Sequence, residues 1–162
     1  MEPRINYLRV ARGVYEAMLG LEKYLHDCGL EESLIDLVKL RASQINGCAY
    51  CIDMHWKDLR SAGEPEQRLY GLAAWEESPY YSDRERAALA WTEAVTNIRE
   101  GHAPDEVYEQ GKKQFTEKEL ADLTLAIAAI NAWNRLAIAA RSVPGIYQPA
   151  KTHELKKKAQ SE

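Results

Sequence analysis

Residues 39–55 read KLRASQINGCAYCIDMH, a helical apolar pattern that is interrupted once, at Asn46-Gly47. Asn-Gly is a strong breaker of regular structure, so a new helix is expected to begin at or near Cys48. Residues three and four apart are neighbours on a helix surface, which places Cys48, Cys51 and His55 on one face. Two thiols and an imidazole therefore meet at a helix N-terminus, and this combination indicates redox chemistry.

The position of the cysteine pair favours reactive thiols. A helix N-terminus or a neighbouring imidazolium can lower the pKa of a cysteine from about 8.5 to roughly 3.5–7.5, and both influences are available here. The β-carbons of residues three apart in a regular helix are ~5–6 Å apart, whereas a disulfide needs ~3.5–4.5 Å. We therefore expect Cys48 in a loosened first turn, where it can cycle with Cys51 between dithiol and disulfide.

Composition describes an ordinary globular domain of 162 residues, 46% of them hydrophobic and 28% charged. The 21 basic and 25 acidic side chains give a net charge of −4, and no basic stripe predicts binding to nucleic acid. We find neither an apolar run of the ~18–20 residues that a membrane span needs nor a signal-peptide core. Three cysteines do not fit a secreted disulfide framework, so a cytoplasmic location away from membranes is expected.

The apolar spacing predicts an all-α fold, because apolar residues recur at intervals of three and four in each long segment. Ser82–Glu85 and Thr116–Glu119 match the capping box that begins many helices. We expect one helical domain over residues 1–150, followed by a polar, lysine-rich tail over residues 151–162. The expected helices cover residues 7–28, 33–45, 48–62, 83–100, 104–114 and 117–143.

Residues 39–55 resemble the signature of the AhpD-like alkylhydroperoxidases in the carboxymuconolactone decarboxylase superfamily. Residues 129–138, AINAWNRLAI, are similar to a later helix of the same domain, and the order of segments fits over residues 7–147. The resemblance implies an all-helical, AhpD-like domain that reduces organic hydroperoxides through a Cys-x-x-Cys dithiol/disulfide cycle. It also implies trimers or hexamers and an external dithiol reductant, with lipoyl-linked donors as the analogy. No cofactor or metal ion is predicted.

The resemblance assigns His55 as the base of a proton relay and places the relay's carboxylate twelve residues before the first cysteine, at Asp36. The family usually has glutamate there, so the shorter Asp36 leaves a direct contact with His55 or a water bridge open. A surface ion pair with Lys39 is the alternative for Asp36. In the predicted cycle Cys48 attacks the peroxide and Cys51 resolves the sulfenic acid, and the reverse assignment uses the same residues.

Other polar residues have weaker assignments. Tyr50, between the two cysteines, is a candidate substrate contact, with aromatic packing as the alternative. Cys28 is typical of a small buried residue near a helix end. Asn131 and Asn134 interrupt an apolar helix, and as buried amides they need hydrogen-bond partners.

Four other functions are alternatives to the peroxidase. A thiol-disulfide oxidoreductase or redox sensor would act on protein partners. A structural zinc module would use Cys48, Cys51 and His55 with Cys28 or a carboxylate, but it would usually show a second cysteine pair. A carboxymuconolactone decarboxylase, as the family is known, does not depend on the pair. A helical assembly subunit would dock through the apolar stripe of residues 7–25, and that stripe also predicts a homo-oligomer.

Overall fold

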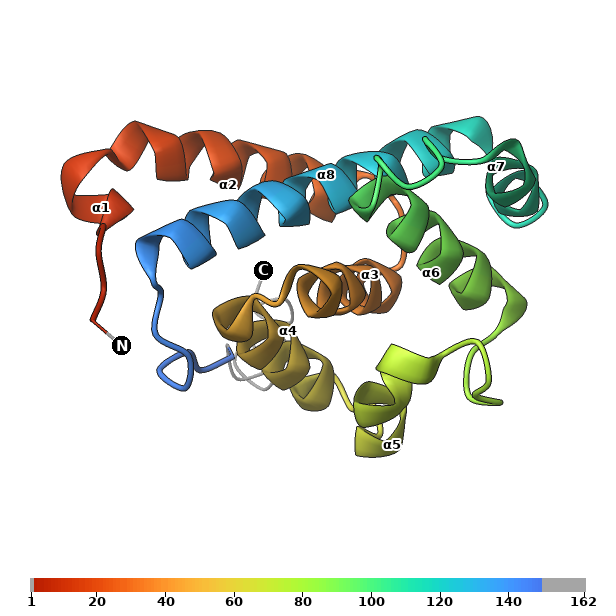
Figure 1. Cartoon of the computed structure of the whole chain (residues 1–162), viewed down its shortest axis with the longest axis horizontal. Coiled ribbons are helices and arrows are strands. Elements are labelled where there is room, and N and C mark those ends of the chain that lie inside the picture. Colours follow the sequence, from red (N-terminus) through yellow and green to blue (C-terminus); the bar gives the residue numbers. More distant parts are fainter. Residues whose placement is uncertain (1, 150–162) are drawn as a thin grey trace, which may run out of the picture.

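The computed structural model describes residues 2–149, which form a bundle of helices without any strand (Figure 1). The predicted all-α fold is therefore confirmed, and the predicted tail at residues 151–162 lies outside the described residues. The elements are α1 (Tyr7–Val10), α2 (Arg12–Asp27), α3 (Glu32–Asn46), α4 (Ala49–Ser61), α5 (Glu66–Tyr70), the 3₁₀ helix η1 (Gly71–Ala74), α6 (Asp83–Thr96), α7 (Asp105–Lys112) and α8 (Glu117–Ala140).

The N-terminal helix differs from the prediction, because it is broken at Ala11. Ala11 has φ −152° and ψ 58°, which are not helical values, and it separates α1 from α2. The Asn6 side chain caps α1 by accepting a hydrogen bond from the backbone N–H of Arg9 at 3.2 Å. The apolar spacing continues through Ala11, so periodicity alone could not reveal the break. Of the predicted stripe, only Leu25 is buried within α2.

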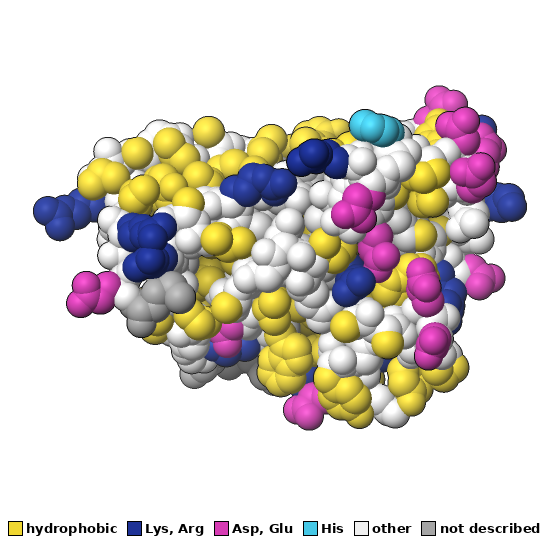
Figure 2. All heavy atoms as spheres, in the orientation of Figure 1, with side chains coloured by type: hydrophobic (Ala, Val, Ile, Leu, Met, Phe, Trp, Pro, Cys, Tyr) yellow, Lys and Arg dark blue, Asp and Glu magenta, His cyan; other side chains and the backbone are white. Residues whose placement is uncertain are grey.

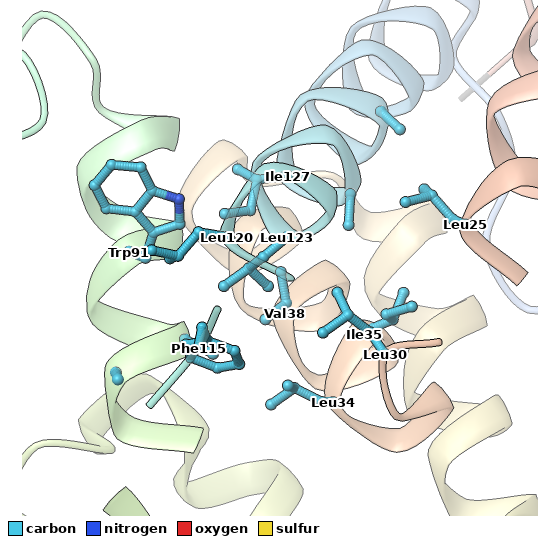
Figure 3. Close-up of a cluster of buried hydrophobic side chains, with 14 residues drawn as sticks. Leu25, Leu30, Leu34, Ile35, Val38, Trp91, Phe115, Leu120, Leu123 and Ile127 are labelled. Carbon is cyan, nitrogen blue, oxygen red and sulfur yellow. The ribbon is translucent and has the colours of Figure 1, made fainter. Parts of the chain in front are cut away.

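The core forms where α3, α6 and α8 meet. Figure 3 shows Val38 of α3 and Leu123 and Ile127 of α8 pointing toward one another, with Trp91 of α6 beside them. Phe115, from the link between α7 and α8, closes the same cluster. The buried indole of Trp91 donates a hydrogen bond to the Thr124 hydroxyl at 2.9 Å, so its one polar atom is satisfied.

Helix α8 is apolar around most of its circumference. Among residues 2–149 it is the one helix that could span a membrane by length and composition, with a mean hydropathy of 1.4 over its most apolar 18 residues. The central helix of a folded domain passes the same test. Here α8 packs against α2, α3, α4, α6 and α7. Because neighbouring helices surround it, α8 carries apolar residues on most sides and not on a single face.

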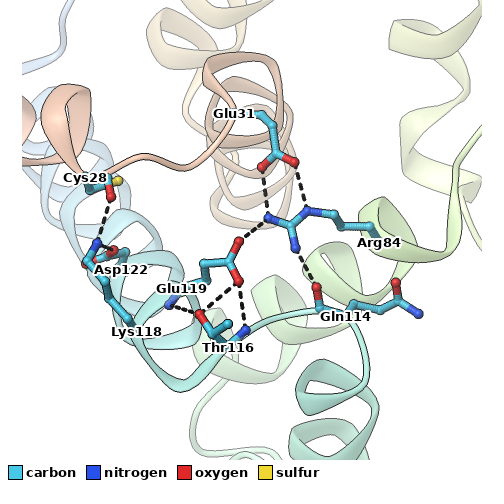
Figure 4. Close-up of polar contacts among 8 residues, drawn as sticks. All are labelled: Cys28, Glu31, Arg84, Gln114, Thr116, Lys118, Glu119 and Asp122. Carbon is cyan, nitrogen blue, oxygen red and sulfur yellow. Dashed lines mark hydrogen bonds and ion pairs between the residues drawn. The ribbon is translucent and has the colours of Figure 1, made fainter.

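Both predicted capping boxes form, at Ser82–Glu85 before α6 and at Thr116–Glu119 before α8. The second belongs to a larger group, the Arg84 cluster, which consists of Glu31, Arg84 and Glu119 (Figure 4). The Arg84 guanidinium contacts both oxygens of Glu31 at 2.9 and 3.0 Å and one oxygen of Glu119 at 2.7 Å. Hydrogen bonds from Thr116 and Arg84 lower the pKa of Glu119 to about 2. The cluster therefore ties the beginnings of α3, α6 and α8 together.

Residues 142–149, which we call the C-terminal segment, return across α4 (Figure 1). Lys57 of α4 donates hydrogen bonds to the carboxylate of Asp53 at 2.9 Å and to the carbonyl of Tyr147 at 3.0 Å. Asp53 also accepts from the backbone N–H of Gly145 at 2.9 Å. These contacts fix the C-terminal segment beside the helix that carries both cysteines.

Candidate functional site

The cysteine pair lies where α3 ends and α4 begins. Gly47 adopts the left-handed conformation, with φ 69°, and the backbone N–H of Cys48 bonds to the Ser43 carbonyl at 3.0 Å. Cys48 is the N-cap of α4, and its sulfur accepts a hydrogen bond from the Cys51 N–H at 3.4 Å. The two cysteines form a disulfide with their α-carbons 5.3 Å apart. The predicted position of the pair at a helix N-terminus is therefore confirmed.

A group of amides holds this turn in place. Asn46 donates hydrogen bonds to the side-chain oxygens of Asn131 at 3.0 Å and Asn134 at 2.8 Å. Asn134 is fully buried and donates to the Ser43 hydroxyl at 3.0 Å. The two α8 amides that interrupt the apolar pattern therefore bind the end of α3. The sequence pointed to buried amides in need of partners but could not identify Asn46 as one of them.

His55 is buried one turn beyond Cys51, with 5% of its surface exposed. Neither of its ring nitrogens has a hydrogen-bond partner among residues 2–149. Its Nδ1 atom lies 3.7 Å from Oδ1 of Asp36 on α3, which is too long for a hydrogen bond and within the range of an ion pair when the imidazole is protonated. Lys39, the alternative partner of Asp36, binds Glu22 of α2 at 2.5 Å instead. Asp36 is thus left facing the imidazole.

A second carboxylate next to His55 was not predicted. Asp58 lies three residues along α4, and the hydroxyl of Tyr147 in the C-terminal segment donates to it at 2.7 Å. Burial raises the pKa of Asp58, and the charge of Asp36 acts in the same direction against the Tyr147 hydrogen bond. Burial and the Asp58 contact likewise raise the pKa of Tyr147. Helical spacing from His55 could have indicated Asp58, but no local signal could have indicated Tyr147.

Two cavities reach the pair from different sides. The His55 cavity, of about 330 Å³, is lined by both carboxylates Asp36 and Asp58 and by Cys51 and Tyr147. The Cys48 cavity, of about 630 Å³, contains Cys48 and lies between the start of α4, the end of α8 and the C-terminal segment. Tyr50, the candidate substrate contact, lines both cavities, and burial raises its pKa. The cysteines thus face different environments.

Cys28 lies apart from this arrangement, as a free thiol packed against the hydrophobic cluster of Figure 3. Within the part of the chain that the structure describes, no three His, Cys, Asp or Glu side chains are grouped so that they could hold a metal ion. The zinc-module alternative therefore has no ligand set at the cysteine pair.

Comparison with known proteins places these features in a family. The family model named Carboxymuconolactone decarboxylase family matches residues 12–94. The uncharacterized protein YdfG of Bacillus subtilis is 42% identical over 139 residues, covering 86% of this chain and 95% of YdfG.

Solved structures of similar proteins support the same family and fold. A protein of unknown function from Agrobacterium tumefaciens, described as a candidate antioxidant defence protein AhpD, is 44% identical with a TM-score of 0.87, covering 90% of this chain and 100% of that one. An AhpD-core, peroxidase-related protein from Ralstonia eutropha is 20% identical with a TM-score of 0.75 over 84% of this chain and 73% of its own, and this likeness concerns the fold alone. The chain belongs to the carboxymuconolactone decarboxylase family and is an AhpD-like member of it.

Proposed function

We propose that the protein is a thiol-dependent peroxidase that reduces organic hydroperoxides with Cys48 and Cys51, using His55 and Asp36 to move the proton. The observation that carries this proposal is the buried imidazole of His55, whose two nitrogens have no partner among residues 2–149. A buried polar group without a partner lowers the stability of the fold by about 1–3 kcal/mol. Its presence one turn from a cysteine pair therefore supports a catalytic role for His55.

The pair itself supports a small substrate. Cys48 and Cys51 are only 1% and 2% exposed, so the folded surface of a protein partner cannot contact the disulfide without displacing other residues, whereas a slender group can enter through the Cys48 cavity. A small hydroperoxide can approach Cys48 through the Cys48 cavity. This contrast favours a peroxidase over the oxidoreductase or sensor that would act on proteins.

In the proposed cycle, His55 takes the proton of Cys51 while Cys51 takes the proton of Cys48, and Asp36 stabilises the imidazolium. Cys48 is then the thiolate, and the Cys51 thiol donates a hydrogen bond that stabilises it. Cys48 attacks the terminal oxygen of the hydroperoxide, the O–O bond breaks, and the leaving alkoxide takes a proton to become the alcohol. Cys48 is then a sulfenic acid. Cys51 attacks its sulfur, water leaves, and the disulfide forms. One hydroperoxide and two thiols give one alcohol, one water and one disulfide.

An external dithiol must then reduce the disulfide by thiol exchange. A lipoyl-linked donor is our proposal for this reductant, and a reducing compartment such as the cytoplasm is the proposed location. No further cofactor enters the cycle.

We also propose a homo-oligomer, either a trimer or a hexamer. Figure 2 shows apolar side chains gathered toward the end of the molecule where Figure 1 places α1 and the start of α2. Leu8 and Val10 of α1 are 58% and 67% exposed, and a gathering of exposed apolar side chains favours an interface between copies. Sedimentation at micromolar concentration should detect the oligomer, and a monomer alone would contradict it.

The test of the activity is peroxide-dependent turnover of cumene hydroperoxide with a dithiol donor. Wild-type protein should consume the hydroperoxide and form the Cys48–Cys51 disulfide, whereas Cys48→Ser and Cys51→Ser should abolish turnover. Cys28→Ser is the matched control, because Cys28 is a free thiol outside the site. Trapping of a sulfenic acid in Cys51→Ser would identify Cys48 as the attacking residue. Turnover that survives both substitutions in the pair would refute the proposal.

A further inference from the structure

We propose that the Cys48 cavity binds hydroperoxides that carry a carboxylate on an apolar chain, and that Arg4 and Arg141 hold this carboxylate. The inference rests on the proposed peroxidase function and specifies its substrate class. It comes from the walls of the cavity, from the two arginines at its rim, and from the different charge of the His55 cavity.

The walls suit an apolar chain. Ala137 and Ile138 of α8 form one side, and Val143 and Pro144 of the C-terminal segment form another. The volume of about 630 Å³ lies within the roughly 300–1,000 Å³ typical of sites for small organic ligands. An apolar chain in this cavity would lead directly to Cys48.

Arg4 and Arg141 supply positive charge without a partner. No ion pair or side-chain hydrogen bond among residues 2–149 involves either guanidinium, and no acidic residue lines the cavity. Arg84, in contrast, contacts two carboxylates. Arginine presents several N–H donors in a planar fork that matches a carboxylate. Two arginines without an ionic partner among residues 2–149, beside an apolar cavity, therefore complement an amphipathic acid.

The backbone brings the two arginines together from opposite ends of the chain. The N–H of Arg4 donates a hydrogen bond to the carbonyl of Ala140, the last residue of α8, at 2.8 Å. Arg141 follows directly, in the left-handed conformation with φ 54°, a backbone state that non-glycine residues rarely adopt. This geometry turns the chain out of α8 and places both side chains around the Cys48 cavity.

The His55 cavity has the opposite character. Asp36, Asp58 and Glu22 line it, and Lys39, the one lysine among the described residues of its lining, is paired with Glu22. Like charges repel an anionic ligand there, so a carboxylate-bearing hydroperoxide should enter on the Cys48 side. The two cavities then have different roles: the substrate binds in the Cys48 cavity, and the proton moves through His55 in the other cavity.

The chemical step is the one already proposed. Cys48 attacks the terminal oxygen, the O–O bond breaks, and the product is the corresponding hydroxy acid, which keeps its carboxylate at the arginines. The dithiol of the protein is oxidised to the disulfide, water is released, and the external dithiol restores the thiols.

The experiment compares linoleic acid hydroperoxide with its methyl ester, which has the same chain and reactive group but no charge. Wild-type kcat/KM should be about tenfold higher for the acid, the scale of one charge-assisted hydrogen bond. The preference should appear in KM and should weaken in high salt. Arg4→Gln and Arg141→Gln should each reduce it, and together they should remove it. Arg99→Gln, an exposed arginine outside the cavity, is the control for net charge.

The outcomes separate this inference from the proposed function. Equal turnover of acid and ester, or a preference that survives the double arginine substitution, would overturn the carboxylate site while the peroxidase stands. Failure to reduce either compound or cumene hydroperoxide would overturn both. A preference that Arg99→Gln lowers as much as Arg141→Gln would show a general charge effect and would also contradict the site.

Discussion

The Arg84 cluster and the His55 site are both polar groups between packed helices, yet they are built in opposite ways. In the cluster, Arg84 contacts both Glu31 and Glu119, and Glu119 also completes a capping box. At the site, both nitrogens of His55 lack partners among residues 2–149, and Asp36 stands 3.7 Å away. The satisfied group is suited to stabilising the fold, whereas the nitrogens of His55 are left available for a proton or a hydrogen bond.

The largest expected effect comes from replacing the unsatisfied group. His55→Asn should lower peroxide turnover by about 10²–10⁴-fold, the usual contribution of a general base. The free energy of unfolding should change by less than about 1 kcal/mol, because the imidazole has no hydrogen bond among residues 2–149 to lose. Turnover assays and urea unfolding measure the two effects. His26→Asn, at an exposed histidine of α2, is the control. A large loss of stability without loss of turnover would make His55 a structural residue.

The opposite pattern is expected at the satisfied group. Arg84→Met should lower the free energy of unfolding by roughly 1–3 kcal/mol, because Glu31 and Glu119 lose their partner. Turnover per folded molecule should not change. Urea denaturation at neutral pH measures the loss, and Arg99→Met should change stability by less than about 0.5 kcal/mol. An unchanged midpoint for Arg84→Met would mean that the cluster does not stabilise the fold.

Acid should weaken the cluster in a defined window. The pKa of Glu119 is lowered from 4.5 to about 2, so its contribution is fully present above pH 4.5 and is lost as the pH falls toward 2. Glu119→Gln should remove this part of the pH dependence and cost about 1 kcal/mol, the scale of a helix cap. Unfolding curves between pH 2 and 6 measure both effects, with Glu117→Gln in the same helical turn as the control. Equal acid sensitivity of Glu119→Gln and wild type would refute this assignment.

The smallest effect is expected at Tyr147, whose hydroxyl donates a hydrogen bond to Asp58 beside the site. Its hydrogen bond lowers the pKa of Asp58, so Tyr147→Phe should raise that pKa further above its usual range. If the ionised Asp58 carboxylate stabilises the protonated imidazole of His55, activity should depend on Asp58 being ionised. The pH at which kcat/KM falls on the acid side of the profile should then rise by less than about one unit. Tyr70→Phe, at an exposed tyrosine of α5, is the control. A profile that shifts equally in both variants would separate Tyr147 from the chemistry.

Most of the helices could be predicted because their signals are local. Each capping box involves residues three apart, and the Asn46-Gly47 break lies next to the helix it introduces. The break at Ala11 was missed because the apolar spacing passes through it. The short elements α5 and η1 were not predicted, since nine residues carry too little periodicity.

The residues of the candidate site also fall into two groups, those that are close in the sequence and those that tertiary packing brings together. Its cysteines and His55 lie on successive turns of one helix, so their order in the chain was enough to place them together. The contact of Tyr147 with Asp58 spans 89 residues, and Arg4 and Arg141 meet only because the N-terminal segment bonds to the end of α8. The sequence alone therefore determined the helices and the reactive face of α4, since neighbours on a helix are fixed by its repeat. Tertiary packing decided what surrounds that face, because such contacts depend on how distant segments dock.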